Sequence, residues 1–263
     1  MDLGLEGKVA IVTGGSDGIG KAAAISMASE GAKVAIVGRT QSKLDDAVAE
    51  IKKASGGEAI GVAADVSVES DVKAMVERVV SEYGKLDILV NNAGTSSSTT
   101  LEKMTDEDLK VDFGIKVYGA VYCARAALPH LKKSGAGAIV NTTTPGGKAA
   151  NPGSQPTSLS RAAGISLTKS WAGEFAKDNI RVNTVCGGGL KSGQHRTRWE
   201  AANAKDSSYS LEDHWKVVGK NVPMGRIGEA HEAGDLICFL ASAKASYITG
   251  TAVNVDGGTS PVV

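Results

Sequence analysis

The sequence predicts an α/β fold in which a doubly wound, mostly parallel sheet carries helices on both faces. Three observations support this prediction. Short β-branched runs alternate with longer amphipathic segments; glycine occurs 33 times whereas aromatic residues make up only 4%; and a glycine cluster follows the first apolar run. Parallel strands joined by crossover helices require such an alternation. We expect a single domain over residues 1–263, because no linker, repeat or low-complexity tract divides the chain.

Seven short runs rich in Val, Ile and Ala have the length and continuous apolarity of buried parallel strands. They are residues 8–12, 33–37, 59–63, 86–90, 138–141, 180–185 and 252–255. Six longer segments between them carry the periodicity of helices. They are residues 18–29, 42–54, 69–83, 106–132, 157–177 and 229–241.

Residues 187–224 interrupt this alternation with a stretch of mixed polarity. Connections in compact domains are usually only a few residues long, and longer ones are often functional. We therefore expect this stretch to form a lid over a substrate site.

The composition excludes several classes of protein. Lys plus Arg and Asp plus Glu number 29 each, so there is no basic excess to bind a nucleic acid backbone. Three isolated cysteines predict neither a disulfide framework nor a zinc site and favour the cytoplasm. The first apolar run is too short for a signal peptide or a membrane span. We expect a cytoplasmic protein whose partner is a small molecule, with no nucleic acid, membrane or metal ion.

The glycine cluster reads TGGSDGIG at residues 13–20, after one predicted strand and before a predicted helix. Glycines there permit a tight turn and let backbone N–H groups approach a pyrophosphate closely. An ordinary glycine turn is the alternative, but the strand–turn–helix context favours a dinucleotide site on a Rossmann-type sheet. The residues of this loop expected to bind the cofactor are Gly14, Ser16, Asp17, Gly18, Ile19 and Gly20.

Arg39 follows the second predicted strand, where an acidic residue would bind the ribose 2′-hydroxyl of NAD and a basic one the 2′-phosphate of NADP. No acid is present in the local sequence VGRT, and a guanidinium can bind phosphate through two hydrogen bonds. NADP is therefore favoured over NAD, the alternative being that Arg39 is a solvated surface residue. Asp17 weakens the prediction, because it adds negative charge near the same phosphates.

The order of these motifs resembles the short-chain dehydrogenase/reductase family along essentially the whole chain. The further matching segments are Asp65-Val66, Asn91-Asn92-Ala93-Gly94, Arg181-Val182-Asn183, Ile248-Thr249-Gly250 and Val255-Asp256-Gly257-Gly258. The resemblance implies that Asp65 and Val66 contact the adenine and that Asn92, Ala93 and Gly94 border the cofactor. It also implies a homo-oligomer, a dimer or a homotetramer, formed through the long fourth and fifth helices.

The resemblance also identifies the catalytic positions, and all four are altered. The family has an Asn on the fourth helix, a Ser after the fifth strand and a YxxxK on the fifth helix. The Tyr exchanges the substrate proton, the Lys lowers the pKa of the Tyr and holds the ribose, and the Ser orients the carbonyl. The corresponding residues here, in the same order, are Lys116, Thr144, Thr157 and Arg161. No YxxxK occurs anywhere in the sequence, so an error of register does not explain the change.

These substitutions change what the site can do. The hydroxyl of Thr157 titrates far above the pKa of a tyrosine, which is about 10, and cannot act as a general base. Arg161 stays protonated, so it can bind a ribose or an anion but cannot transfer protons. Thr144 retains the hydroxyl donor of the serine. The spacing places Thr157 and Arg161 on one helix face, opposite an apolar stripe. The stripe comprises Leu159, Ala163, Leu167 and Trp171.

Two residues could replace the missing tyrosine. His195 lies in the predicted lid and titrates near neutrality. With Lys191, Arg196 and Arg198 it forms a basic cluster, which either captures an anionic substrate or is an ordinary solvated surface. Lys116 could act as an ammonium of lowered pKa, or it could simply fill the space of the tyrosine.

The chain also departs from the family after the sixth strand. The family usually has Pro-Gly beside the nicotinamide, and this chain has Cys186 followed by three glycines. Gly188 and Ser192 are expected to border the cofactor here, with Ser192 near the position of a family Thr that bonds it. Arg161 is expected to contribute to cofactor binding as well.

Three functions remain open on this sequence. The first is an NADP-dependent oxidoreductase that acts on a carbonyl or alcohol, including an anionic one, with a rebuilt proton relay. The second is a non-redox lyase, isomerase or dehydratase on the same fold. The third is a catalytically silent cofactor-binding subunit. The resemblance favours the first, whereas the joint loss of Tyr and Lys favours the other two.

Overall fold

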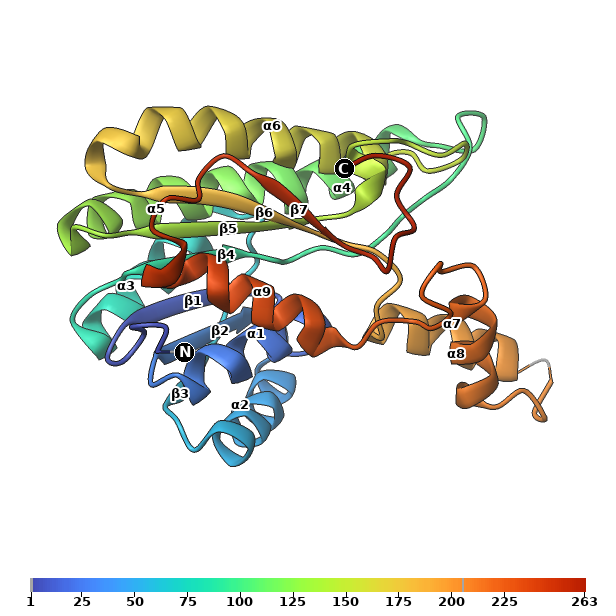
Figure 1. Cartoon of the computed structure of the whole chain (residues 1–263), viewed down its shortest axis with the longest axis horizontal. Helices are drawn as coiled ribbons and strands as arrows, with labels where there is room; N and C mark the ends of the chain where they lie inside the picture. Colours follow the sequence, from blue (N-terminus) through green and yellow to red (C-terminus); the bar gives the residue numbers. More distant parts are fainter. Residues whose placement is uncertain (1, 205) are drawn as a thin grey trace.

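A computed structural model describes residues 2–204 and 206–263. Within these residues, seven strands form one parallel sheet in the order β3-β2-β1-β4-β5-β6-β7 (Figure 1). The strands are β1 (Val9–Thr13), β2 (Lys33–Gly38), β3 (Ala59–Ala63), β4 (Ile88–Asn91), β5 (Ala138–Thr143), β6 (Arg181–Gly187) and β7 (Ala252–Val255). The predicted doubly wound α/β fold is confirmed.

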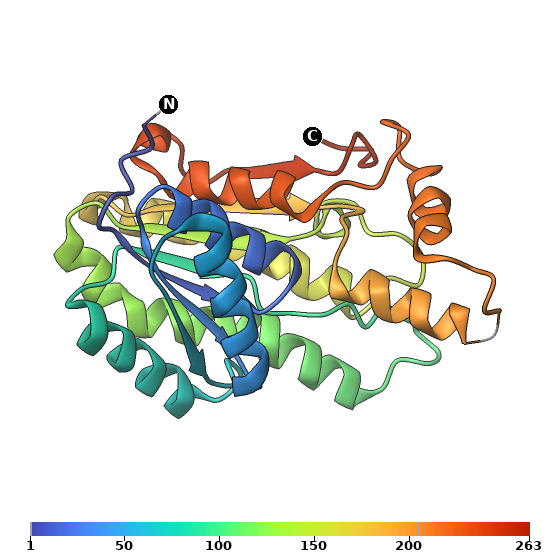
Figure 2. The ribbon, with the colours of Figure 1, turned by 90° about the horizontal axis from the view of Figure 1, so that it is seen from below.

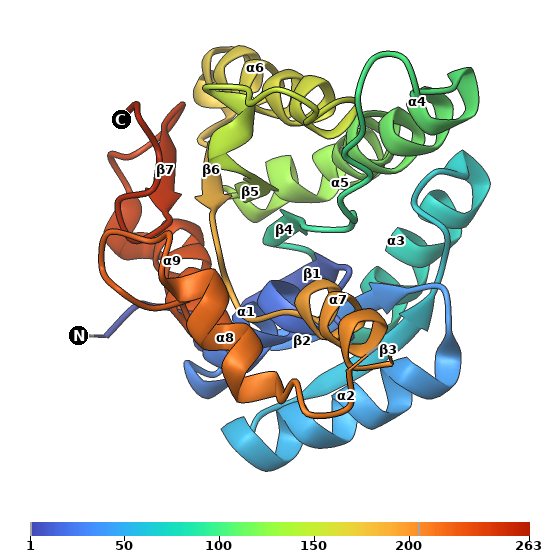
Figure 3. The same cartoon turned by 90° about the vertical axis from the view of Figure 1, so that its right-hand side faces the viewer.

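Helices cover both faces of the sheet (Figure 3). One face carries α1 (Gly18–Ser29), α2 (Gln41–Ser55) and α9 (Ala230–Ala241). The other carries α3 (Glu69–Tyr83), α5 (Gly119–Ser134) and α6 (Thr157–Phe175). Along β1, Ala10 and Val12 pack into the first core while Val9 and Ile11 pack into the second. A strand buried on both faces has no polar side, which is why the strand runs are continuously apolar.

The segment predicted as one helix over residues 106–132 is divided into three, so that prediction is wrong in detail. The parts are α4 (Asp106–Phe113), a π-helical turn η1 (Gly114–Tyr118) and α5. Thr105 begins α4 with a capping box, in which its hydroxyl accepts a hydrogen bond from the backbone N–H of Asp108. A π-turn widens the helix by one residue per turn and re-aims the side chains that follow it. Lys116, at the centre of η1, is buried.

The buried face of α6 carries hydroxyl groups along most of its length, in contrast to what its sequence suggests, and becomes apolar near its C-terminal end at Ala172 and Phe175. Leu159, from the apolar stripe, is 44% exposed, whereas Thr157, Ser160 and Thr168 are buried. The helix therefore presents hydroxyl groups to the sheet and to α4.

Three short 3-10 turns lie beside helices α6 and α9. They are η2 (Pro145–Gly147), η3 (Ala176–Asp178) and η4 (Ala243–Ala245).

Residues 187–224 contain two helices, α7 (Gly193–Asn203) and α8 (Leu211–Gly219). Both lie at one end of the molecule, beyond the carboxyl ends of the strands (Figure 2). Leu190 is buried at the start of this segment, and Lys191 N donates to Gly228 O at 2.9 Å. All three cysteines are free and buried. Among the described residues, no helix combines the length and apolarity needed to cross a membrane.

Candidate active site

A cleft of about 800 Å³ opens where β1, β4, β5 and β6 end. In a parallel sheet, this edge at the point where the strand order reverses is where ligands bind. Most of the residues predicted from the sequence to form a site line this one cleft. They are Gly14, Ser16, Asp17, Gly18, Ile19, Asn92, Gly94, Thr144, Thr157, Arg161, Gly188, Ser192 and His195.

The glycine loop is held by tight backbone contacts. Gly14 and Gly18 have φ angles of 64° and 54°, which favour glycine. A Cβ atom on Gly20 would lie 2.3 Å from Gly14 O and 2.4 Å from Asn92 Nδ2. The Asn92 amide donates to Thr13 O at 3.0 Å and Gly14 O at 3.1 Å, and Ala93 N donates to Thr13 Oγ1 at 3.1 Å. The loop after β4 is therefore fastened to the loop after β1.

The first turn of α1 is open toward the cleft. Asp17 occupies the N-cap position, but its side chain makes no hydrogen bond to the helix. Its carboxylate instead accepts a hydrogen bond from Arg196 of α7 at 2.5 Å. An uncapped helix N-terminus beside close-packed glycines is suited to hold a phosphate group. Glycine at positions 14 and 20 lets the glycine loop and the loop after β4 pack this closely, and that packing shapes the cradle that a dinucleotide would occupy.

The residues expected at the adenine end lie at the ends of β2 and β3, outside the lining of the main cleft. Arg39 is exposed just after β2. The hydrogen bond from Ser67 Oγ at 2.6 Å lowers the pKa of Asp65 against the opposing effect of burial. The backbone N–H of Ser67 and, least of all, the charge of Arg39 also lower it. Val66 points inward, because its Cγ2 atom lies only 3.0 Å from the position of a Cβ on Gly119. Val66 therefore packs against the start of α5.

Two of the four predicted catalytic positions, Lys116 and Thr157, meet in a buried network around Asp112, a residue that the sequence did not indicate. Lys116 Nζ donates to Asp112 Oδ2 and, at 3.2 Å, to Thr157 Oγ1. The Asp112 carboxylate also accepts from the hydroxyls of Ser97 at 2.7 Å, Thr157 at 3.2 Å and Ser160. The side chains of Lys116 and Asp112 are only 3% and 1% exposed. The signal that could have found Asp112 is its spacing of four residues from Lys116, which places an acid and a base side by side on a helix.

Burial disfavours the charged forms of both Lys116 and Asp112, and the hydrogen bond between them opposes that effect. Burial, together with the positive charge of Arg161, lowers the pKa of Lys116 to about 8, although Asp112 opposes the shift. Burial would raise the pKa of Asp112, but hydrogen bonds from Lys116, Ser160 and Ser97 outweigh it and hold the value below its usual range. At neutral pH the pair is therefore an ammonium and a carboxylate.

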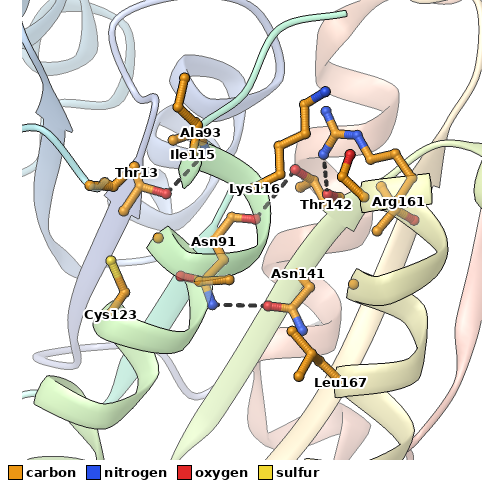
Figure 4. Close-up of a pocket in the computed structure, with 16 residues that line it drawn as sticks. Thr13, Asn91, Ala93, Ile115, Lys116, Cys123, Asn141, Thr142, Arg161 and Leu167 are labelled. Carbon is orange, nitrogen blue, oxygen red and sulfur yellow. Dashed lines mark hydrogen bonds between the residues drawn. The ribbon is translucent and has the colours of Figure 1, made fainter. Parts of the chain in front are cut away.

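Arg161 enters the site from α6 beside the lysine (Figure 4). Its Nη1 donates to Thr142 O at 2.7 Å, while among the described residues its buried Nε has no hydrogen-bond partner. Burial lowers the pKa of Arg161. Gly94 makes room for both cations, because a Cβ there would lie 3.1 Å from Lys116 Cγ and 3.3 Å from Arg161 Nη2. Beneath them is a small cavity of about 20 Å³, where Asn91 donates to Asn141 at 2.9 Å.

Residues 187–224 place His195 on the cleft, but salt bridges neutralise part of the predicted basic cluster. The His195 ring lies 5.7 Å from the His214 ring and 6.0 Å from the Trp215 ring. Burial lowers the pKa of His195, helped by the nearby charge of Arg198, so its imidazole is neutral at pH 7. Lys191 pairs with Glu229 at 2.5 Å, and Arg196 pairs with Asp17.

Two kinds of similarity bear on this cleft. A family model described as enoyl-(acyl carrier protein) reductase matches residues 14–260. The chain is 36% identical over 260 residues to an uncharacterized oxidoreductase of Thermotoga maritima, covering 99% of this chain and 100% of that one. It is 35% identical to the 3-oxoacyl-[acyl-carrier-protein] reductase FabG of the same organism, covering 97% and 98%.

Solved structures share the fold and much of the sequence. The L-sorbose reductase of Gluconobacter frateurii, in complex with NADPH and L-sorbose, superimposes with a TM-score of 0.94 at 34% identity over 100% of both chains. The 3-ketoacyl-(acyl-carrier-protein) reductase of Brucella melitensis, in complex with NADH, gives a TM-score of 0.85 at 33% identity, covering 97% of this chain and 99% of that one.

Proposed function

Since the chain belongs to the short-chain dehydrogenase/reductase family of NAD(P)-binding oxidoreductases, we propose that it is an NADP(H)-dependent reductase of a neutral, hydroxyl-bearing carbonyl compound. The observation that carries this proposal is the cleft itself. Its floor is a glycine-lined dinucleotide cradle, and its opposite wall is rich in hydroxyl groups. When bound, NADPH supplies the hydride.

The preference for the phosphorylated cofactor rests on Arg39 and on the pairing of Asp17. Arg39 is exposed at the end of β2, where a 2′-phosphate would lie. Arg196 neutralises Asp17, which reduces the repulsion that an acid in the glycine loop would exert on phosphates. Backbone N–H groups of the loop would hold the diphosphate, while Ser192 and Arg161 would hold the nicotinamide half. The NADPH complex of the L-sorbose reductase supports this assignment.

The substrate half of the cleft is polar. Its hydroxyl and amide side chains include Ser96, Ser98, Thr144, Ser154, Ser158 and Gln194. Ile19 and Leu190 are the large aliphatic side chains among the described lining residues. Because an acyl chain would leave these polar groups unpaired, the lining favours a polyhydroxylated carbonyl compound. Lys191 and Arg196 are already paired, and Arg198 is the cation of the predicted cluster that lines the cleft, so the lining offers less to an anion than the sequence suggests. Residues 187–224 act as the lid of this pocket.

Lys116 is the proton source best supported by the geometry. Thr157 lines the cleft and Lys116 lies behind it, in hydrogen-bond contact with its hydroxyl. A threonine hydroxyl has one proton to donate and two lone pairs to accept. If its proton turns from Asp112 toward a substrate oxygen, it can pass on a proton while it receives one from Lys116. Below a pH of about 8 the ammonium is available for this role.

The homo-oligomer implied by the family remains a prediction. Exposed apolar side chains on α4, η1 and α6 support it, namely Val111 at 51%, Tyr118 at 55% and Leu159 at 44% exposure.

The proposal is tested by binding and turnover. NADPH and NADH are titrated by fluorescence, and NADPH oxidation is then followed with L-sorbose, other ketoses and acetoacetyl thioesters. We expect tighter binding of NADPH, turnover of ketoses and loss of turnover in Lys116→Met. Lys132→Met, which removes a surface lysine of α5, is the control. Tight NADPH binding without turnover of any carbonyl would overturn the reductase assignment, and failure of both nucleotides to bind would overturn the cofactor assignment.

A further inference from the structure

Asp112 on α4 is a buried carboxylate that accepts hydrogen bonds from four side chains. Lys116, Ser97 and Thr157 donate to Oδ2, and Ser160 donates to Oδ1. A buried carboxylate is costly unless it is paired and its lone pairs are satisfied, and here both conditions are met.

The same carboxylate ties together the segments that form the site. Asp112 lies in the last turn of α4, Ser97 in the loop after β4, and Ser160 in the first turn of α6. Lys116 follows in the π-turn η1. The long lysine side chain has many rotamers, and the contact with Asp112 selects the one that also reaches Thr157 at 3.2 Å.

We propose that Asp112 is a positioning residue for the reaction, which holds the Lys116 amine against Thr157 Oγ1 and keeps that amine protonated at neutral pH. This inference rests on the proposed role of Lys116 as the proton source.

The charges around the amine explain why it needs a counter-ion. Arg161 on α6 acts on Lys116 as a like charge, and Cys123 on α5 lines the small cavity beside it. Burial raises the pKa of Cys123 to about 12, so this thiol is neutral and offers no negative charge. Of the titratable groups around the amine, Asp112 is the one that favours the ammonium.

The test compares pH profiles of reduction in the wild type and Asp112→Asn. Without the carboxylate, burial and Arg161 favour the neutral amine, so the decline of kcat at high pH should begin about one pH unit lower or more. At pH 7.5 a shift of one unit in the pKa of Lys116 lowers its protonated fraction about threefold, so we expect kcat to fall at least about threefold, with the KM for NADPH within about twofold. Glu82→Gln is the matched control, because Glu82 forms an exposed pair with Arg78 at the same spacing on α3. Its profile should not move.

A second variant and a second readout keep the inference falsifiable. If Asp112→Asn does not fold, Asp112→Ser removes the charge and leaves room for water. A double-mutant cycle measures the coupling between the two residues without any cofactor. It compares the unfolding equilibrium constants of the wild type, Asp112→Asn, Lys116→Met and the double variant, and we expect a coupling of at least about tenfold in that constant. The positioning role would be overturned if a folded Asp112→Asn or Asp112→Ser variant showed the same decline of kcat at high pH as the wild type, even with strong coupling. If Lys116→Met also kept that decline unchanged, the role of Lys116 as the proton source would be overturned instead.

Discussion

Lys116 Nζ donates a hydrogen bond to Thr157 Oγ1 at 3.2 Å, so the residue predicted at the family's asparagine position contacts the one predicted at its tyrosine position. The lysine side chain is only 3% exposed and is buried beside the short side chain of Thr157. This contact, together with the ion pair to Asp112, makes several outcomes predictable.

Stability should depend on pH through Lys116. Its pKa is about 8 in the folded protein and about 10.5 in an unfolded chain, so the unfolded chain binds more protons between these values. Below pH 8 the buried ammonium lowers the free energy of unfolding by its full amount. As the pH rises toward 10.5 the amine loses its proton in the folded protein, and the free energy of unfolding rises by up to about 3 kcal/mol. We expect the unfolding free energy of the wild type to rise relative to Lys116→Met over this range. Urea denaturation at several pH values measures it, and a constant difference would contradict it.

Arg39→Ala should weaken NADPH binding and leave NADH binding nearly unchanged. Loss of charge-assisted hydrogen bonds to a phosphate costs about 1.5–3 kcal/mol, or about tenfold to a hundredfold in Kd. Lys43→Ala, on the neighbouring helix α2, removes a nearby surface charge as a control. Equal weakening of both nucleotides by Arg39→Ala would show that this residue does not read the 2′-phosphate.

Gly20→Ala should abolish cofactor binding and lower stability, because its Cβ would collide with Gly14 O at 2.3 Å, a backbone atom that cannot move freely. Gly173→Ala is the control within α6, where a Cβ meets nothing within 4 Å. Replacing glycine in a helix interior stabilises by roughly 0.5–1 kcal/mol. Thermal unfolding and NADPH titration distinguish the two variants, and normal binding by Gly20→Ala would refute the close-packed cradle.

Arg196→Gln should weaken NADPH binding, because it leaves Asp17 unpaired beside the phosphates. Asp17→Asn should strengthen binding slightly, and the double variant should recover most of what Arg196→Gln loses. Nucleotide titrations at two salt concentrations measure these effects, since exposed charge pairs are screened by salt. Additive effects of the two substitutions would show that the pair does not act across the cleft.

Much of the site followed from short-range patterns. The glycine loop and Asn92 line one cleft as expected, because each follows a predicted strand closely, and Ser192, which was placed by the family resemblance, lines the same cleft. The sequence left open whether Lys191 and Arg196 bind an anion or lie on a solvated surface, because their partners Glu229 and Asp17 are distant in sequence. His195 reaches the cleft, but its packing against His214 and Trp215 could not be read from spacing.

The sequence by itself determined the parallel α/β sheet and the location of the dinucleotide cradle, because apolar periodicity and glycine conformation act over a few residues. Only the tertiary structure decided which side chains the predicted catalytic residues contact. The π-turn at Gly114–Tyr118 turns Lys116 inward, and packing of α4 against α6 brings Asp112 to Ser160 and Thr157. These contacts join residues more than forty positions apart, so no local sequence pattern records them. The pKa of Lys116 likewise depends on its burial and on the charges of Arg161 and Asp112, which only the folded structure brings around it.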